Sequence, residues 1–249
     1  MRGLSAVTVV IPAHNEEKNI KKLLTQTIKT LKPMKVNFEI VVVDDGSEDD
    51  TFLVAKQFAC KNDEIVVIKH LKREGKSMAL RSGFAKAKGD VIITIDADLQ
   101  YDPDEIPCLL KTLEKGYDVV TGYRDFSQYA PSKVVFSKIY NKIASATFGT
   151  RNIHDLNCGL KAFRREVVEQ LLTKIVWRNG IHRYLISLCA VLGYKITEVK
   201  VSLKQRTHGR SKYGLKRFVE GISLLLILFL KVKMPNFKTC VGSRTNAFH

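Results

Sequence analysis

The sequence lacks cysteine pairs of the kind that bind zinc or form a redox centre. Its five cysteines are odd in number and far apart, and none belongs to a CxxC pair. The apolar stretch before Pro12 is only about six residues long, which is shorter than the hydrophobic region of a signal peptide. We therefore expect reduced thiols in a cytoplasmic protein that is not exported.

Long hydrophobic runs are also missing. The most apolar segment, 221–230, is bounded by Glu220 and Lys231, whereas a spanning helix needs roughly 20 apolar residues. It is either a buried core helix or an interfacial helix whose basic N-terminal side meets lipid phosphates. A second basic amphipathic stretch, 132–148, favours the membrane surface. We expect a basic loop and membrane-associating helix over 204–233, followed by a poorly ordered tail over 234–249.

Acidic residues are scarce relative to basic ones. The chain has 41 Lys and Arg against 25 Asp and Glu, a formal net charge of +16. Such an excess indicates polyanionic partners: nucleic acid, phospholipid or a phosphorylated substrate. A nucleic-acid-binding protein would show basic residues and exposed aromatics around a groove, whereas the organised motifs here are acidic. We therefore expect no nucleic-acid partner and keep that function as a distant alternative.

Two nucleotide-related motifs are absent. The loop 73–77 contains Gly-Lys-Ser but lacks the full GxxxxGK[ST] pattern of a P-loop. The single tryptophan, Trp177, does not form the QxxRW motif of processive polysaccharide synthases. The first absence excludes a P-loop enzyme, and the second argues against a processive synthase that polymerises sugars.

The first half of the chain alternates strand and helix patterns, which predicts a mainly parallel, Rossmann-like α/β sheet with helices on both faces, within one domain over 1–203. The pattern becomes less regular after residue 117. The predicted strands are 7–11, 38–43, 64–68, 91–95, 117–121 and 195–201, and the predicted helices are 16–31, 49–58, 76–87, 104–113, 164–172 and 181–192.

The fourth strand is followed by five carboxylates in TIDADLQYDPDE, 94–105. Three interpretations are open: a metal site, a solvated turn, or a helix start. In an extended chain Asp96, Asp98 and Gln100 would project to one side, about 6.6 Å apart, and could bind a hard divalent cation. Asp102 and the acids after it suit a helix N-terminus with Pro103 in its first turn. Capping needs one acid near the helix start and does not account for two more at the strand end. We therefore assign Asp102, Asp104 and Glu105 mainly to capping, and Asp96, Asp98 and Gln100 to metal and substrate.

A second acidic cluster, VVVDDGSEDDT, follows another strand end. By itself it is ordinary turn chemistry, because Asp-Gly and Ser are common turn residues. Beside Asn15-Glu16 and Asp96, which also follow strands, it is better interpreted as a set of hydrogen-bond acceptors for a nucleoside.

At this point the chain resembles family 2 glycosyltransferases of the GT-A fold, and within them the dolichol-phosphate mannose synthase group, which glycosylates polyprenyl phosphates. The resemblance runs from residue 7 to about 230. It is carried by VIPAHNEE (10–17), VVDDGSEDDT (42–51), REGKSMALRSGF (73–84), GDVIITIDADLQYDP (89–103), GYR (122–124), DLNCGLKAFRR (155–165) and RTHGRSKYG (206–214).

The resemblance implies roles for individual residues. Asp96, Asp98 and Gln100 would bind Mg²⁺ or Mn²⁺ and the donor diphosphate, and Arg124 would meet phosphate oxygens. Asp155 is interpreted as a residue that shapes the site, with base catalysis as an alternative. His14 stands where relatives often have Tyr. The implied nucleotide-sugar contacts are Pro12, His14, Glu16, Val43, Asp45, Ala97, Arg206 and Lys212.

The implied reaction is attack of a lipid phosphate oxygen on the anomeric carbon of a nucleotide sugar, GDP-mannose or a UDP-sugar, with inversion. A phosphate nucleophile is already anionic, so positioning and metal stabilisation of the leaving diphosphate would supply most of the catalysis. The expected partners are the donor, a dolichyl or other polyprenyl phosphate, the cytosolic face of a membrane and a separate membrane-anchoring subunit. The alternative is a family 2 enzyme that acts on another acceptor.

Overall fold

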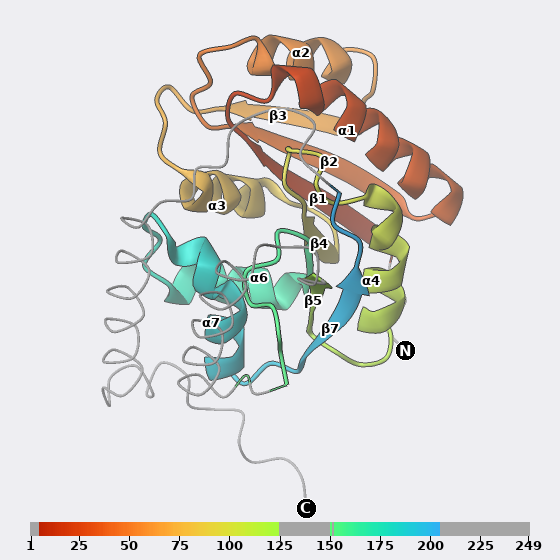
Figure 1. The fold of residues 1–249 in the computed structure, drawn as a ribbon, viewed down its shortest axis with the longest axis vertical. Coiled ribbons are helices and arrows are strands. Elements are labelled where there is room, and N and C mark those ends of the chain that lie inside the picture. Colours follow the sequence, from red (N-terminus) through yellow and green to blue (C-terminus); the bar gives the residue numbers. More distant parts are fainter. Residues whose placement is uncertain (1–4, 125–149, 151, 205–249) are drawn as a thin grey trace, which may run out of the picture.

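A seven-stranded mixed sheet forms the centre of the protein (Figure 1). The structure, a computed structural model, describes residues 5–124, 150 and 152–204. Its strand order is β3-β2-β1-β4-β6-β5-β7. The amphipathic stretch predicted at 132–148 lies outside the described residues, as do 205–233 of the predicted basic loop and helix and the predicted tail, 234–249.

The first half of the chain confirms the predicted strand and helix alternation. β1 pairs in parallel with β2 on one side and β4 on the other, and β2 pairs in parallel with β3. The parallel strands place their carboxyl ends at one edge of the sheet. The elements are β1 (Ala6–Ala13), α1 (Glu17–Leu31), η1 (Lys32–Met34), β2 (Asn37–Asp44), α2 (Thr51–Ala59), β3 (Ile65–Lys69), α3 (Lys76–Lys86) and β4 (Val91–Thr94).

The helix start predicted after the acidic segment is also confirmed. Asp102 precedes a short 3₁₀ helix with Pro103 in its first turn, and the Asp102 side chain accepts a hydrogen bond from the Asp104 amide. The remaining elements are η2 (Pro103–Glu105), α4 (Ile106–Leu113), β5 (Val119–Arg124), β6 (Lys161–Arg164), α6 (Arg165–Lys174), η4 (Ile181–Tyr184), α7 (Leu185–Val191) and β7 (Ile196–Val201).

Strand β6 is the element that the sequence pattern did not predict. It has four residues, begins with a lysine and runs antiparallel to both neighbours, β4 and β5. A strand this short with a charged residue in it gives no alternating signal. Its direction matters because the start of β6, unlike the starts of the parallel strands, lies at the carboxyl edge of the sheet. The loop before β6 is thereby brought to that edge.

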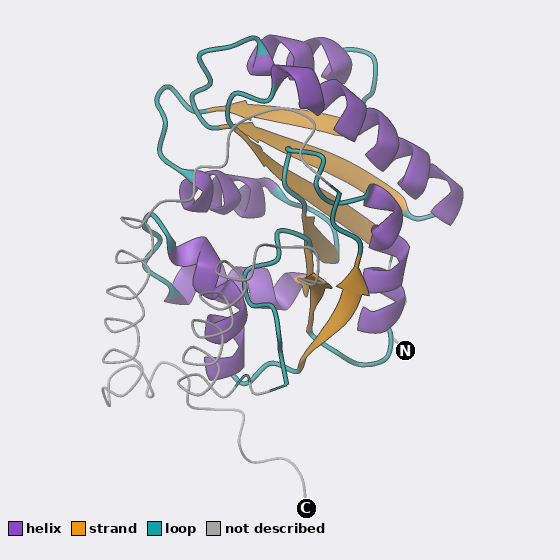
Figure 2. Cartoon of the chain, viewed as in Figure 1, coloured by secondary structure: helices purple, strands orange, loops and turns teal. Residues whose placement is uncertain are grey.

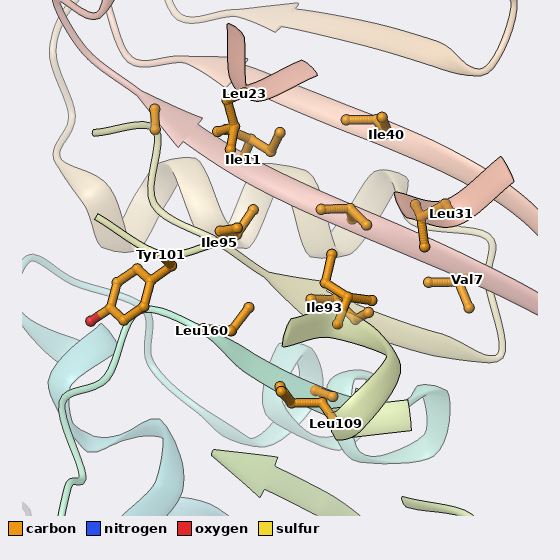
Figure 3. Packing of buried hydrophobic residues seen from close by; sticks show 14 of the residues in the cluster. Val7, Ile11, Leu23, Leu31, Ile40, Ile93, Ile95, Tyr101, Leu109 and Leu160 are labelled. Carbon is orange, nitrogen blue, oxygen red and sulfur yellow. The ribbon is translucent and has the colours of Figure 1, made fainter. Parts of the chain in front are cut away.

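Helices cover both faces of the sheet, as predicted (Figure 2). One core cluster packs α1, α2 and α4 against one face of the sheet, where it includes Val7, Ile11 and Ile93. Figure 3 shows part of this cluster. The other packs α3, α6 and α7 against the opposite face, where Phe84 meets Phe163 edge to face at 5.9 Å between ring centroids. Among the described residues, no helix is long and apolar enough to cross a membrane.

Close packing of α3 on β1 generates a stability prediction at Gly83. A Cβ at this helical position would lie 2.3 Å from Val10 Cγ1. Glycine to alanine normally stabilises a helix by up to about 1 kcal/mol, but overpacking a core costs about 1 to 3 kcal/mol. We expect Gly83→Ala to lower the free energy of unfolding in urea denaturation.

A double-mutant cycle supplies the control. Val10→Ala removes the obstructing methyl groups, so Gly83→Ala should cost less in that background than in the wild type. Equal costs in both backgrounds would contradict the close packing of α3 on β1.

Candidate active site at the carboxyl edge of the sheet

The loops after β1 and β2 form one hydrogen-bonded unit. The Asp45 amide donates to Ala13 O at 2.8 Å, and the Asn15 amide donates to Ser47 Oγ at 2.9 Å. The Glu48 amide donates to Asn15 Oδ1 at 2.9 Å. Asn15 adopts a left-handed conformation with φ of 58°, which asparagine tolerates better than most residues. The predicted convergence of these two acidic strand ends is therefore present.

Asp45 organises the loop that precedes α3. Its Oδ1 accepts a hydrogen bond from the Glu74 amide at 2.9 Å, and its Oδ2 accepts one from the Gly75 amide at 2.8 Å. Its Oδ1 also lies 3.0 Å from His70 Nδ1, and His70 Nε2 lies 2.9 Å from Ser82 Oγ. Asp45 is buried and fixes the point at which α3 begins. Its predicted contact with the nucleotide stays a prediction.

A tight turn, and not an extended chain, follows β4. The strand ends at Thr94, Leu99 has φ of 60°, and the Gln100 amide donates to Asp98 Oδ1 at 3.2 Å. The Leu99 side chain is buried in the core, and this packing helps to hold the turn. The expectation that three alternate side chains project to one side of an extended strand is therefore wrong, because packing and local hydrogen bonds override strand alternation. Asp96, Asp98 and Gln100 instead share one turn.

The Asp96 carboxylate is held between a lysine and a glycine. Lys76 Nζ, at the start of α3, lies 2.5 Å from Asp96 Oδ1. A Cβ on residue 159 would lie 2.5 Å from Asp96 Oδ2, so only glycine fits at Gly159 without displacing the carboxylate. The peptide of Gly159 is fixed on both sides: its amide donates to Tyr101 Oη at 2.9 Å, and its carbonyl accepts from Thr94 Oγ1 at 3.0 Å.

The charges around Asp96 keep it ionised. Burial is the largest single influence and by itself would raise the pKa of this carboxyl, but the adjacent Lys76 ammonium lowers it through both its charge and its hydrogen bond. Lys161 and Arg124 also lower the pKa, so that it lies below the ordinary value for aspartate. Asp96 is therefore a carboxylate at neutral pH.

The turn after β4 fits a divalent cation that is shared with a phosphorylated ligand. Mg²⁺ and Mn²⁺ prefer oxygen ligands and often complete their shells with substrate phosphates and water. Asp96 and the buried Asp98 supply two carboxylates from one turn, and Gln100 supplies an amide oxygen. Within the described part of the chain, no group of three His, Cys, Asp or Glu side chains comes together as a metal site.

Arg124 and Asp155 form a two-point ion pair beside this turn. Arg124 ends β5, and Asp155 lies in the loop before β6. Arg124 Nε lies 2.5 Å from Asp155 Oδ2, and Arg124 Nη2 donates to Asp155 Oδ1 at 2.9 Å. Asp155 is fully buried, and its Oδ1 also accepts from the Asn157 amide at 3.1 Å. This geometry suits a residue that positions the Arg124 guanidinium.

Lys161 places a buried ammonium group beneath the site. It begins β6, opposite Thr94 of β4 and Thr121 of β5, and is only 4% exposed. Its Nζ donates to the carbonyl of Cys158. Burial lowers the pKa of Lys161 to about 8, although the carboxylates of Asp155 and Asp96 act in the opposite direction.

Four residues of the site had no role predicted from the sequence: Lys76, Lys161, Tyr101 and Gly159. Both lysines stand in motifs that carried the family resemblance. Lys76 gave no further signal, because a lysine that follows glycine at a helix start is common on protein surfaces. Lys161 did carry a signal, since it interrupts the apolar stretch Gly159-Leu160-Lys161-Ala162-Phe163, and a charge in such a stretch is rarely buried without function.

The predicted nucleotide contacts lie along the ends of β1, β2 and β4. Pro12 and Val43 are opposite each other in the β1–β2 pair. The side chains of Val43 and Ala97 are buried in the core clusters, so any contact with a ligand would use their backbone. The Glu16 side chain accepts from Asn19 Nδ2 at 2.7 Å, and His14 lies in the loop between Ala13 and Asn15. Arg206 and Lys212 lie outside the described residues.

Comparison with known families matches this architecture. The family described as "Glycosyl transferase family 2" matches residues 8–172, which include the acidic turn, the Arg124–Asp155 pair and β6. The chain belongs to glycosyl transferase family 2. The family resemblance seen in the sequence motifs is therefore confirmed.

Curated relatives of this family 2 chain share a lipid phosphate in their names. Two of the most similar are undecaprenyl-phosphate 4-deoxy-4-formamido-L-arabinose transferases from Proteus mirabilis and Photorhabdus laumondii, at 34% and 35% identity over 217 residues. Each alignment covers 87% of this chain and 65% of the relative. A Pseudomonas fluorescens protein of the same name is 36% identical over 86% of this chain and 62% of its own length. The chain thus spans less than two thirds of these relatives.

Solved structures confirm the GT-A fold. Glucosyl-3-phosphoglycerate synthase from Mycobacterium tuberculosis, crystallised with Mn²⁺ and UDP-glucose, superposes with a TM-score of 0.67. The match covers 94% of this chain and 81% of that chain at 21% identity. The same enzyme with Mn²⁺, UDP-glucose and phosphoglyceric acid gives the same TM-score of 0.67.

The buried charge of Lys161 predicts a pH-dependent stability. Its pKa is about 8 in the folded protein and 10.5 ordinarily, so the unfolded chain binds more protons between these values. Stability therefore rises with pH from about 8 towards 10.5, by up to about 1.4 kcal/mol per pH unit. We expect Lys161→Met to be more stable than wild type at pH 7.5, with a smaller difference at pH 9.5, in urea denaturation.

Exposed Lys111 on α4 provides a matched control. Lys111→Met should follow the wild-type pH dependence. If the difference in free energy of unfolding between Lys161→Met and the wild type is the same at pH 7.5 and pH 9.5, the protein has no buried ammonium at this position.

Proposed function

We propose that this family 2 glycosyltransferase transfers a sugar from a nucleotide sugar to a polyprenyl phosphate, in a reaction assisted by a divalent cation. The observation that carries the proposal is the gathering of Asp96 and Asp98 with Lys76 and the Arg124–Asp155 pair at the carboxyl edge of the sheet. Carboxylates suit a divalent cation, and the adjacent cations suit the phosphates of the donor and the acceptor.

The relatives favour the lipid acceptor and a UDP-linked donor. The curated relatives are named for transfer to undecaprenyl phosphate, and the structural neighbours were crystallised with UDP-glucose. The family name and fold leave the sugar open. A UDP-sugar is therefore our first choice of donor, with GDP-mannose as the second, and undecaprenyl phosphate is preferred to dolichyl phosphate as the acceptor.

The residues of the site divide the work of this reaction. Asp96 and Asp98, with Gln100 in the same turn, would hold Mg²⁺ or Mn²⁺. A cation bound there would neutralise charge that develops on the leaving diphosphate. Arg124, held at two points by Asp155, would direct fixed N–H donors towards phosphate oxygens.

A general base is not needed in this scheme. The lipid phosphate is already anionic, and both oxygens of Asp155 are engaged by Arg124. We therefore assign Asp155 a positioning role in place of base catalysis. Because the acceptor is a membrane lipid, we further propose that the protein works at the cytosolic membrane surface. A separate membrane-anchoring subunit stays a prediction.

The direct test is a transfer assay with purified protein. It combines Mn²⁺ or Mg²⁺ and a short-chain polyprenyl phosphate with labelled UDP-glucose, UDP-N-acetylglucosamine, a UDP-linked amino-arabinose derivative or GDP-mannose. We expect label to enter the lipid phase from one donor only in the presence of a divalent cation. Asp98→Ala should abolish this transfer, whereas Asp63→Ala, at an exposed position far from the turn, should retain it.

Two results would contradict the proposal. Transfer by Asp98→Ala at the wild-type rate with matched metal would remove the turn after β4 from the site. Label that moves from a donor to a water-soluble acceptor, and never to the lipid, would support a family 2 enzyme with another acceptor.

A double-mutant cycle of Asp155 and Arg124 tests the positioning role of Asp155. Asp155→Asn and Arg124→Met should each slow transfer by roughly thirtyfold, because a charge-assisted hydrogen bond contributes about 2 kcal/mol. The double variant should be no slower than the slower single variant, since Asp155 acts through Arg124. Multiplicative losses, or a loss in Asp155→Asn that only high pH restores, would favour base catalysis by Asp155.

A further inference from the structure

The ion pair between Lys76 and Asp96 occupies a carboxylate oxygen that the proposed divalent cation would need. Lys76 Nζ lies 2.5 Å from Asp96 Oδ1. The other oxygen, Oδ2, faces Gly159, at whose position a Cβ would come within 2.5 Å. A cation that binds Asp96 through Oδ1 therefore has to displace the lysine.

The backbone holds Lys76 at this position. Lys76 is the first residue of α3, and Gly75 before it has φ of 93°, in the left-handed region that favours glycine. The Gly75 and Glu74 amides both donate to Asp45. A Cβ on residue 75 would also lie 2.3 Å from Asn179 Oδ1, so the loop is packed from the other side as well. The side chain of Lys76 can move, but its Cα is fixed beside the acidic turn.

The pair is strong enough to compete and weak enough to be displaced. The side chains of Lys76 and Asp96 are 34% and 27% exposed. Ion pairs with this much solvent access contribute up to about 1 kcal/mol, which corresponds to roughly a fivefold change in an equilibrium constant. A divalent cation alone would have to displace the ammonium into water. A cation that arrives with a diphosphate would offer the ammonium new anionic oxygens next to the same turn.

We propose that Lys76 competes with the divalent cation for Asp96 and thereby makes tight cation binding conditional on the nucleotide diphosphate. This inference rests on the proposed function. It assigns Lys76 a role in coupling the two ligands: the lysine opposes the cation in the absence of the donor and joins the donor phosphates once both are bound. By linkage, the cation must tighten nucleotide binding by the same factor.

Two lysines near Asp96 allow direct pairing with the carboxylate to be distinguished from simple repulsion of the divalent cation by a positive charge. Lys161 acts on Asp96 through space, but its ammonium donates to the carbonyl of Cys158. Loss of Lys161 should strengthen cation binding to a similar degree with and without nucleotide. Loss of Lys76 should strengthen it only without nucleotide, so the ratio of the two affinities separates the mechanisms.

The experiment measures Mn²⁺ binding to the full chain by electron paramagnetic resonance, without nucleotide and with saturating UDP or GDP, after correction for Mn²⁺ bound to free nucleotide. In the wild type we expect the nucleotide to tighten Mn²⁺ binding. In Lys76→Met we expect Mn²⁺ alone to bind roughly fivefold more tightly than in the wild type. The enhancement by nucleotide should shrink by at least the same factor.

Three matched variants serve as controls. Lys72→Met removes an exposed lysine from the same loop and should change neither affinity. Lys161→Met should leave the enhancement by nucleotide unchanged. Lys76→Arg keeps a cation that can pair with Asp96 and should preserve both the weak binding of Mn²⁺ alone and the enhancement.

The outcomes separate this inference from the proposed function. If nucleotide binds with Mn²⁺ and the enhancement is the same in wild type and Lys76→Met, the coupling role of Lys76 is refuted and the proposed function stands. Weaker binding of Mn²⁺ alone in Lys76→Met would refute it as well. If the wild type binds neither UDP nor GDP under any metal condition, both the inference and the nucleotide-sugar reaction fail.

Discussion

A half-buried carboxylate at the end of the central strand is the constraint around which the site is arranged. Asp96 must stay ionised in a place where burial opposes ionisation, so cations have to come to it from other parts of the chain. Lys76 arrives from α3, Lys161 from β6 and Arg124 from β5. Gly159 leaves room for the carboxylate, and Tyr101 holds the Gly159 peptide in position.

Two features of the fold make this arrangement possible. The parallel β1, β2 and β4 present their following loops at one edge, and hydrogen bonds from Asp45 fix the loop that starts α3. Antiparallel β6 then brings its own beginning, with the loop of Asp155 and Gly159, to the same edge. A parallel strand at that position would have carried this loop to the opposite edge of the sheet, away from Asp96.

The proposed chemistry follows from having more than one kind of cation in the site. The guanidinium of Arg124 is held at two points and is suited to a fixed role. The ammonium of Lys76 is partly exposed and pairs with Oδ1 of Asp96, so it can exchange partners when ligands arrive. Lys161 is buried and donates to the Cys158 carbonyl, which suits a cation that keeps its partner when ligands arrive. Residues with the same formal charge therefore serve different purposes because their burial differs.

Much of this protein could be predicted from sequence because the determining signals are local. Apolar runs and helical periodicity gave the first four strands and three helices, and Asp102 with Pro103 marked a helix start that the structure contains. The motifs identified the family, and the order of strands and helices placed the acidic loops at one edge. These features depend on side-chain periodicity and turn chemistry, which are properties of neighbouring residues.

Only the tertiary structure decided the rest. The turn after β4 replaced the expected extended chain because Leu99 packs into the core. The direction of β6 depends on its partners β4 and β5, which lie far from it in sequence. The pairing of Lys76 with Asp96 and of Arg124 with Asp155 joins residues 20 and 31 positions apart. Such contacts arise when the sheet brings distant loops together, so the sequence determined which charges are present, and the fold decided which of them meet.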